Sequence, residues 1–165
     1  MAACGELDQV ARGLYRVPGH PLTEHVTTTA VLKRVPGAVL CLLSALHFHN
    51  IGTQQPHAVW IALGRKARKP RITDVPVRSV RFSAKALTYG VQTVEVDGLP
   101  IRVTSVARTV VDCFRYRNKI GLDVALEALK DVVGRRLATP AEIERVAGAC
   151  RARTVMRPYL EMVSA

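Results

Sequence analysis

The sequence predicts an α+β fold, in which a small mixed or antiparallel sheet carries helices packed mainly on one side. Short runs that alternate apolar and polar residues indicate strands, and an Asp-Gly dipeptide between two such runs favours a tight hairpin. Two helix starts in the second half of the chain carry capping residues. Because the strands are expected as hairpins and not in regular alternation with helices, a doubly wound parallel sheet is not expected.

The charge of the chain is its most unusual bulk property. Its 165 residues include 24 Lys plus Arg but only 13 Asp plus Glu, which gives a net charge of +11. The sequence pI is about 10.2. A balance this basic is typical of proteins that bind nucleic acid, although acidic protein partners exploit the same field.

The cysteines and the hydropathy pattern exclude several classes. Cys4, Cys41, Cys113 and Cys150 are far apart and form no Cys-x-x-Cys pair, which argues against a zinc ribbon or a redox motif. We expect them to be reduced, in a cytoplasmic setting. There is neither a signal peptide nor an apolar run long enough to span a bilayer, so no membrane association is predicted.

The first half of the chain is expected to mix strands and helices. Residues 14–17 alternate as a strand that Pro18 and Gly19 end, with residues 5–7 as its candidate partner. A helix is predicted over 23–34. The dense apolar run 38–49 is either a buried helix or a strand leading into a helix, and its length favours helix for most of it. Residues 57–63 are predicted as a mostly buried strand.

The second half gives clearer predictions. Residues 77–82 alternate as a strand, and residues 84–89 form a short turn of helix. Residues 91–96 and 99–103 flank Asp97-Gly98, the dipeptide that best suits a two-residue type I′ turn. Helices are also predicted from Thr104, where Thr104 or Ser105 caps the start, from Gly121, from Pro140 to about Cys150, and over 159–163.

The helix that follows the hairpin carries opposite charges at spacings that allow ion pairs along one side of the helix. Arg108 and Asp112 are four residues apart and Asp112 and Arg115 three apart, so a local ion pair is available. We interpret these three residues as structural: a buried or half-buried pair that locks the helix against the 91–103 hairpin. A second helix after Gly121 is predicted to bury Leu122, Ala125, Leu126, Leu129 and Val132.

The block 65–71 is the strongest local concentration of charge, with five basic residues in seven positions. Gly64 before it and Pro70 within it predict a loop. Like charges this close are costly unless solvent or an acidic partner compensates them. We predict a surface that binds nucleic-acid phosphates or an acidic partner, formed by Arg65, Lys66, Arg68, Lys69, Arg71, Arg78 and Arg81.

No residue pattern in the chain indicates catalysis, a cofactor or a metal. His47 and His49 point in different directions on a helix, and His57 adds no ligand spacing. Glu127 and Lys130 match a surface ion pair better than a metal site beside Asp112. Ser44 lacks the Gly-x-Ser-x-Gly setting of an activated serine.

Three segments resemble the AbiEi-type antitoxins of type IV abortive-infection toxin–antitoxin systems. Residues 12–19 are similar to the end of the wing of an N-terminal winged helix. Ser44–Leu46, followed by Gly52 and Gln55-Pro56, is similar to a second marker. The third and most specific segment is Val103–Arg115, continued through Lys119–Leu129. The resemblance covers about residues 12–163.

The resemblance implies a promoter-binding winged helix and a carboxyl-terminal effector domain that counteracts a nucleotidyltransferase-type toxin. Residues 1–19 would be a remnant of the wing and linker, to which Arg12 and Arg16 add charge, and residues 20–165 the effector domain. The helix-turn-helix expected before Gly5 is missing from the sequence. Without a recognition helix, we predict weak DNA binding through phosphates.

Two alternatives remain open from the sequence. An Arg-Thr-x-x-Asp helix like that at Arg108 also occurs in neighbouring families with nuclease-like domains, which would use Asp112 and Glu127 as carboxylates. The third possibility is an adaptor whose basic face binds an acidic protein.

Overall fold

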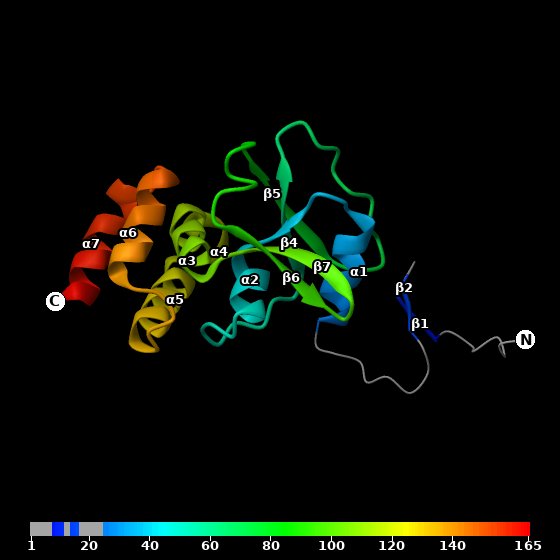
Figure 1. Cartoon of the computed structure of the whole chain (residues 1–165), viewed down its shortest axis with the longest axis horizontal. Coiled ribbons are helices and arrows are strands. Elements are labelled where there is room, and N and C mark those ends of the chain that lie inside the picture. The colour runs from blue at the N-terminus through cyan, green and yellow to red at the C-terminus, as the bar shows by residue number, and fades with distance from the viewer. Residues whose placement is uncertain (1–7, 12–13, 17–24) are drawn as a thin grey trace, which may run out of the picture.

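A computed structural model describes residues 8–11, 14–16 and 25–165, and its centre is a five-stranded mixed sheet (Figure 1). The strand order is β5-β4-β3-β7-β6. This confirms the predicted α+β class. The strands are β3 (Val39–Leu40), β4 (Val59–Gly64), β5 (Val77–Phe82), β6 (Val91–Val96) and β7 (Leu99–Thr104).

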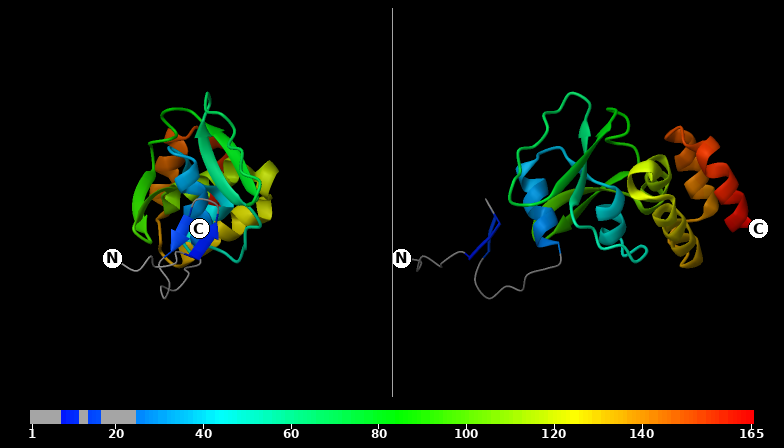
Figure 2. Two further views of the ribbon diagram at one scale, coloured as in Figure 1. Left: turned by 90° about the vertical axis from the view of Figure 1, so that its right-hand side faces the viewer. Right: turned by 180° about the vertical axis from the view of Figure 1, so that it is seen from behind.

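The helices form layers around the sheet, as Figures 1 and 2 show. They are α1 (Val26–Arg34), α2 (Leu42–Phe48), α3 (Val106–Arg115), α4 (Arg117–Ile120), α5 (Leu122–Gly134), α6 (Pro140–Ala149) and α7 (Arg153–Ser164). Helix α1 covers one face of the sheet. The helices that follow β7, α3 to α7, gather beyond the opposite face, with α6 and α7 outermost. The helices are therefore mainly, but not all, on one side.

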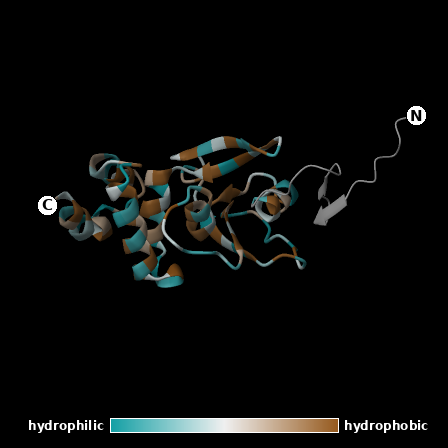
Figure 3. Cartoon of the chain, turned by 90° about the horizontal axis from the view of Figure 1, so that it is seen from below, coloured by the Kyte–Doolittle hydropathy of each residue, from teal (hydrophilic) through white to brown (hydrophobic). Residues whose placement is uncertain are grey.

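Each face of the sheet has its own core. Val39, Ala62 and Phe82 point toward α3, α5 and the outer helices. Leu40 and Ile61 point the other way and pack with Val31 of α1. Figure 3 shows apolar and polar residues in brown and teal on the same helices and strands. Alternate residues of β3 and β4 are buried on opposite faces, which explains why their sequences read as continuous apolar runs.

The predicted hairpin is confirmed: β6 and β7 pair antiparallel from Val91↔Thr104 to Val96↔Leu99. Asp97 and Gly98 both have positive φ, +52° and +77°, as a type I′ turn requires. The expectation of hairpins throughout the sheet is wrong for β4 and β5, which pair in parallel. Parallel neighbours need a long crossover connection, and residues 65–76 provide it.

The run 38–49 contains a short strand and then a helix, so the helical interpretation of most of it holds only from Leu42 onward. Leu40 pairs with both β4 and β7, and tertiary pairing therefore decided a segment whose apolar pattern suits either structure. The predicted strand at 57–63 is β4, and that at 77–82 is β5. Residues 84–89 form hydrogen-bonded turns in place of a helix.

The capping predictions are confirmed. The Ser105 side chain accepts from the Arg108 N–H at 3.3 Å at the start of α3. Thr139 and Glu142 form a complete capping box on α6. The last helix begins at Arg153, earlier than predicted. Leu122 is 39% exposed, because it stands at the first position of α5 before the apolar stripe turns inward.

At the amino-terminal end, β1 (Asp8–Ala11) pairs antiparallel with β2 (Leu14–Arg16). The partner strand is therefore 8–11, and the predicted partner at 5–7 lies outside the described residues. The division into residues 1–19 and 20–165 stays a prediction. No helix in the described part of the chain has both the length and the apolar character needed to cross a bilayer.

Candidate functional site

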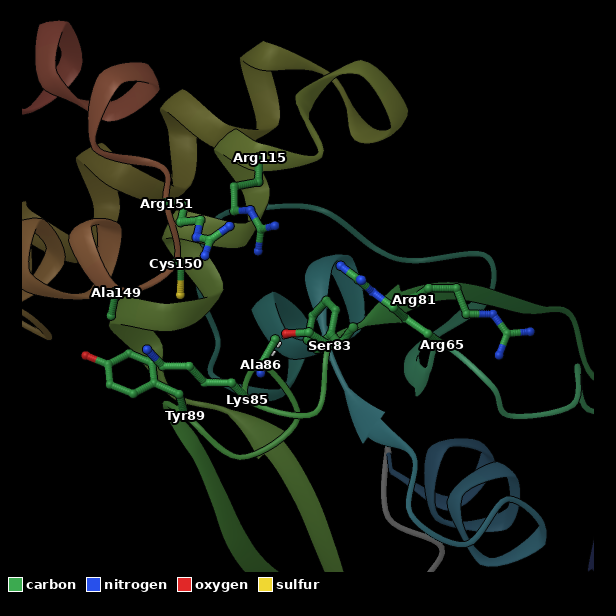
Figure 4. A pocket seen from close by; sticks show the side chains of 11 residues that line it. Arg65, Arg81, Ser83, Lys85, Ala86, Tyr89, Arg115, Ala149, Cys150 and Arg151 are labelled. Atoms are coloured by element: carbon green, nitrogen blue, oxygen red, sulfur yellow. Dashed lines mark hydrogen bonds between the residues drawn. The ribbon is translucent and has the colours of Figure 1, made fainter.

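A pocket of about 450 Å³ lies where the sheet meets the helical layer (Figure 4). Arg65 and Arg81 stand on one side of it, and Arg115, Cys150 and Arg151 on the other. Lys85 and Tyr89 close it from below in the same view. The complete lining is Arg65, Arg81, Phe82, Ser83, Lys85, Ala86, Tyr89, Arg115, Ala149, Cys150 and Arg151.

The topology explains why these residues meet. Arg65 directly follows β4, and Arg81 lies at the end of β5, so the parallel pairing brings both to one edge of the sheet. The turns at 83–90 then lead from β5 to the hairpin. Arg115 is the last residue of α3, and Arg151 stands between α6 and α7. The pocket thus lies outside the carboxyl ends of two parallel strands, where ligands commonly bind in α/β sheets.

The lining is strongly basic. Arg65, Arg81, Lys85, Arg115 and Arg151 are five cationic side chains, and the described lining residues include no acidic one. All five residues are exposed. A concave surface with charges of one sign concentrates the electrostatic field, so this pocket attracts anions.

Two interactions hold the basic loop 65–71 beside the pocket. The Arg81 Nη1 donates to the Gly64 carbonyl at 2.9 Å and also to the Ala67 carbonyl. Further along the same connection, Asp74 accepts two hydrogen bonds from Arg34 of α1, at 2.9 and 3.0 Å. The loop is therefore attached both to β5 and to α1, while its other basic side chains point to solvent.

Beneath the pocket lies the Arg108–Asp112 pair. The Arg108 Nε donates to the Asp112 Oδ2 at 3.0 Å, and both side chains are 0% exposed. This confirms the predicted buried ion pair. Arg115 joins it from the surface, with its Nη1 3.7 Å from the Asp112 Oδ1 and its side chain 34% exposed.

The sequence predicts that this pair locks α3 against the 91–103 hairpin, but the Arg108 side chain makes its hydrogen bonds to the residues just before the hairpin. Its Nη1 donates to the Ala86 carbonyl at 2.9 Å and to the Tyr89 carbonyl, and its guanidinium carbon lies 4.8 Å from the centre of the Phe82 ring. Gly90 has φ +64°, and a Cβ there would lie 3.0 Å from the Arg108 Cβ. Arg108 therefore packs against the turns that precede the hairpin, which are part of the pocket wall.

Burial changes the acid–base behaviour around the pair. It raises the pKa of Asp112 against the opposing effects of Arg108 and Arg115. Burial likewise raises the pKa of the Cys150 thiol, the one cysteine in the pocket lining. A thiol with a raised pKa is a poor nucleophile, so the pocket is suited to binding and not to thiol chemistry.

The nuclease alternative finds no geometric support. The Asp112 carboxylate is fully buried against Arg108, whereas a carboxylate that acts on a phosphodiester must reach its substrate. Glu127 accepts from the Thr53 Oγ1 at 2.6 Å, and Asp131 accepts from the Gly52 N–H at 2.9 Å. Both bonds attach the 50–53 loop to α5. Within residues 8–11, 14–16 and 25–165, no group of three or more metal-type ligands gathers.

The other polar residues considered as chemistry have structural contacts. Ser44 accepts from the Trp60 N–H at 2.8 Å, which joins α2 to β4. The Nε2 of His49 lies 2.7 Å from the carbonyl oxygen of Thr104, and burial lowers the pKa of this imidazole. A neutral His49 therefore donates to the end of β7, just before α3 begins.

The predicted binding residues divide into two groups. Arg65 and Arg81 line the pocket, whereas Lys66, Arg68, Lys69, Arg71 and Arg78 are exposed outside it. Arg12 lies outside the described residues, and of Arg16 only the backbone in β2 is described. Lys85 and Arg151 were missed, and Arg115 was assigned a structural role alone. No local pattern distinguishes them, because four separated segments converge here.

No protein-family model matches the chain, and no curated protein matches it.

Proposed function

We propose that this chain is an antitoxin and transcriptional autoregulator of a type IV toxin–antitoxin operon, in which it counteracts a nucleotidyltransferase-type toxin. It represents mainly the effector domain, residues 20–165. Support for this family comes from the resemblance of Val103–Leu129, and that segment forms the α3–α5 framework at the centre of the helical layer. In this proposal the segment holds the domain together.

The observation that carries the proposal is the exposure of the loop cations on a fixed backbone. All five basic residues of loop 65–71 are exposed, and Arg81 and the Arg34–Asp74 pair hold the loop at both ends. A fixed row of cations neutralises phosphates at a lower cost in conformational entropy than a free tail. The proposed partner of this surface is promoter DNA.

Phosphate contact explains what this surface does and what it does not do. Lys and Arg that neutralise phosphates release counterions, so affinity falls steeply as salt rises. Such contacts carry no sequence information directly. Through this surface the chain therefore binds DNA weakly and without strong sequence preference.

A mobility-shift titration with promoter duplex and scrambled duplex tests this role. At low salt we expect similar affinity for both, and a loss of about 10³-fold or more between roughly 50 and 200 mM salt if six phosphates are neutralised. Reversing Lys66, Arg68 and Lys69 to Glu must weaken binding and flatten the salt dependence.

The control reverses two exposed cations outside the loop, Lys130 within α5 and Arg136 just after it, and α5 lies in the helical layer away from the loop (Figures 1 and 2). This double variant should keep the affinity of the unmodified chain. Equal losses in the two variants, or salt-insensitive binding, would contradict the proposed surface.

The antitoxin role needs its own experiment. The proposal requires that a nucleotidyltransferase is encoded beside this chain, and co-expression with that enzyme should restore growth that the toxin alone arrests. The loop variant should retain this protection if the loop serves DNA binding only. Failure of the unmodified, stably expressed chain to protect would remove the antitoxin assignment, and co-purification with an acidic protein would favour the adaptor alternative.

A further inference from the structure

We propose that the basic pocket beside the loop binds the phosphates of a 5′-phosphorylated nucleoside, either as a free nucleotide or at the end of a nucleic-acid strand. This goes beyond the proposed function, which concerns duplex phosphates on the exposed loop and needs no pocket. Four features of the described residues support it: the charge of the lining, its shape, its apolar part, and the buried support behind it.

The charge specifies the anion. Five cationic side chains from separate segments line one concavity, and the acidic side chain nearest to them, Asp112, is buried and paired with Arg108. Repulsion among like charges is unfavourable until a multiply charged group neutralises them. Arginine forks match phosphate oxygens in pairs, and four of the five cations are arginines. A phosphate chain provides this charge in a compact form.

The shape favours a small ligand over a duplex. At about 450 Å³, the pocket falls within the range of roughly 300–1,000 Å³ typical of small-molecule sites. Its walls belong to two layers, the β4–β5 edge and the α3–α6 side. A duplex presents a convex backbone, which suits the exposed loop, whereas the end of a strand or a single nucleotide can enter a recess between layers.

The lining also offers an apolar surface. The Tyr89 ring lies at the edge of the pocket beside the Lys85 side chain (Figure 4), and Ala149 and Cys150 face it from the helical side. An aromatic face beside cations is the usual arrangement for stacking a base while its phosphates are bound, and such stacking tolerates any base. This combination distinguishes a nucleotide from a simple inorganic anion.

The buried pair prepares the pocket in advance. The Arg108 Nη1 holds the Ala86 and Tyr89 carbonyls, so the turn that presents Lys85 and Tyr89 is fixed before a ligand arrives. The Nη2 of the same guanidinium is buried and has no hydrogen-bond partner among the described residues. The guanidinium also packs against the pocket lining, with its carbon 4.8 Å from the centre of the Phe82 ring.

Arg151 is the best residue at which to test the pocket, because its backbone conformation accepts glycine and the side chain can be removed without strain. It has φ +57° and forms the left-handed residue that ends α6, with Ala152 N–H bonded to Ala147 O at 2.7 Å. Glycine is the usual residue at this position of the motif. Arg136 ends α5 in the same way, with φ +57° and the Leu137 N–H bonded to Val132 O at 2.9 Å, but it does not line the pocket.

Calorimetric titration of the full chain at low salt is the experiment. The probes are ATP, adenosine, inorganic triphosphate, and a short single strand with either a 5′-phosphate or a 5′-hydroxyl. We expect ATP or the 5′-phosphorylated strand to bind more tightly than adenosine and than inorganic triphosphate. Whichever binds more tightly identifies the source of the phosphate.

Arg151→Gly should weaken that binding about tenfold, the loss expected for one charge-assisted contact, while the melting temperature stays the same or rises. Arg136→Gly should have the same effect on melting and none on binding. The proposal is overturned if no nucleotide or strand end binds, if inorganic triphosphate binds as tightly, or if Arg151→Gly and Arg136→Gly have the same effect on binding.

The two proposals fail separately. Duplex binding that survives the reversal of Lys66, Arg68 and Lys69, with ATP binding intact, would remove the loop surface and leave the pocket assigned. Absence of ATP binding, with duplex binding that weakens in that variant, would leave only the loop surface assigned.

Discussion

Two sets of arginines meet at the junction between sheet and helices, and their surroundings give them different roles. Arg108 is fully buried, and it uses its donors on Asp112 and on two carbonyls of the chain. Arg115 and Arg151 are exposed and point into a basic recess, where the Arg115 Nη1 is 3.7 Å from the Asp112 Oδ1. Arg108 donates to the carbonyls of Ala86 and Tyr89, and these two residues line the same recess.

The comparison shows how one residue type serves both the fold and the site. A buried guanidinium must be paired, because an unpaired charge in the interior is strongly destabilising. A surface guanidinium is solvated, so its removal costs the fold little and leaves its charge available for a ligand. Substitutions on the two sides should therefore affect different measurements.

The largest effect is expected for Arg108→Met. The substitution leaves Asp112 buried without its partner and releases the turns at 83–90, so the free energy of unfolding should fall by about 3–5 kcal/mol in urea titrations. The double variant Arg108→Met with Asp112→Leu should recover part of the loss, because no lone charge remains. A loss of less than about 1 kcal/mol for Arg108→Met would contradict the view that buried Arg108 stabilises the fold while exposed Arg115 and Arg151 do not.

Gly90→Ala tests the close packing against Arg108. The residue has φ +64°, and its new methyl would press on the Arg108 Cβ at 3.0 Å. The left-handed conformation alone costs about 1–2 kcal/mol for a residue with a Cβ, and the contact adds to it. Gly37→Ala is the control, since Gly37 has φ +81° with no atom within 4 Å among the described residues. Equal losses in the two variants would mean that the contact contributes nothing.

His49 tests how protonation of a buried imidazole next to the start of α3 changes the stability of the fold. Burial depresses the pKa of His49 below its ordinary value of 6.5, so the unfolded chain binds a proton more readily than the folded one. The stability that the neutral imidazole provides is present above pH 6.5 and is lost as the pH falls through the lower folded pKa. His49→Gln should remove this dependence in urea titrations at about pH 7.5 and about pH 5.5. If His49→Gln left the difference in the free energy of unfolding between the two pH values unchanged, the role given to the neutral imidazole would be wrong.

The smallest effect on stability is expected at the pocket. Lys85→Ala should change the free energy of unfolding by about 0.5 kcal/mol or less, because the residue is exposed and lies among like charges. Any change should favour the variant at low salt and vanish as salt screens the repulsion. A large loss would show that Lys85 belongs with Arg108 and not with the pocket.

Local chemistry in the sequence was sufficient for several features. The Asp97-Gly98 turn, the Ser105 cap, the capping box at Thr139 and the spacing of Arg108 and Asp112 all depend on neighbours within a few residues, and the structure confirms each one. The exposure of the loop cations was predictable in the same way, because Gly64 and Pro70 preclude a regular element there.

Tertiary structure decided the rest. The parallel pairing of β4 with β5 and the strand at Val39–Leu40 depend on partners far along the chain, which periodicity cannot identify. The pocket is the clearest case. Arg65, Arg81, Lys85, Arg115 and Arg151 carry no common motif in the sequence. Only the fold brings the ends of β4 and β5, the turns at 83–90, the end of α3 and the α6–α7 turn around one pocket.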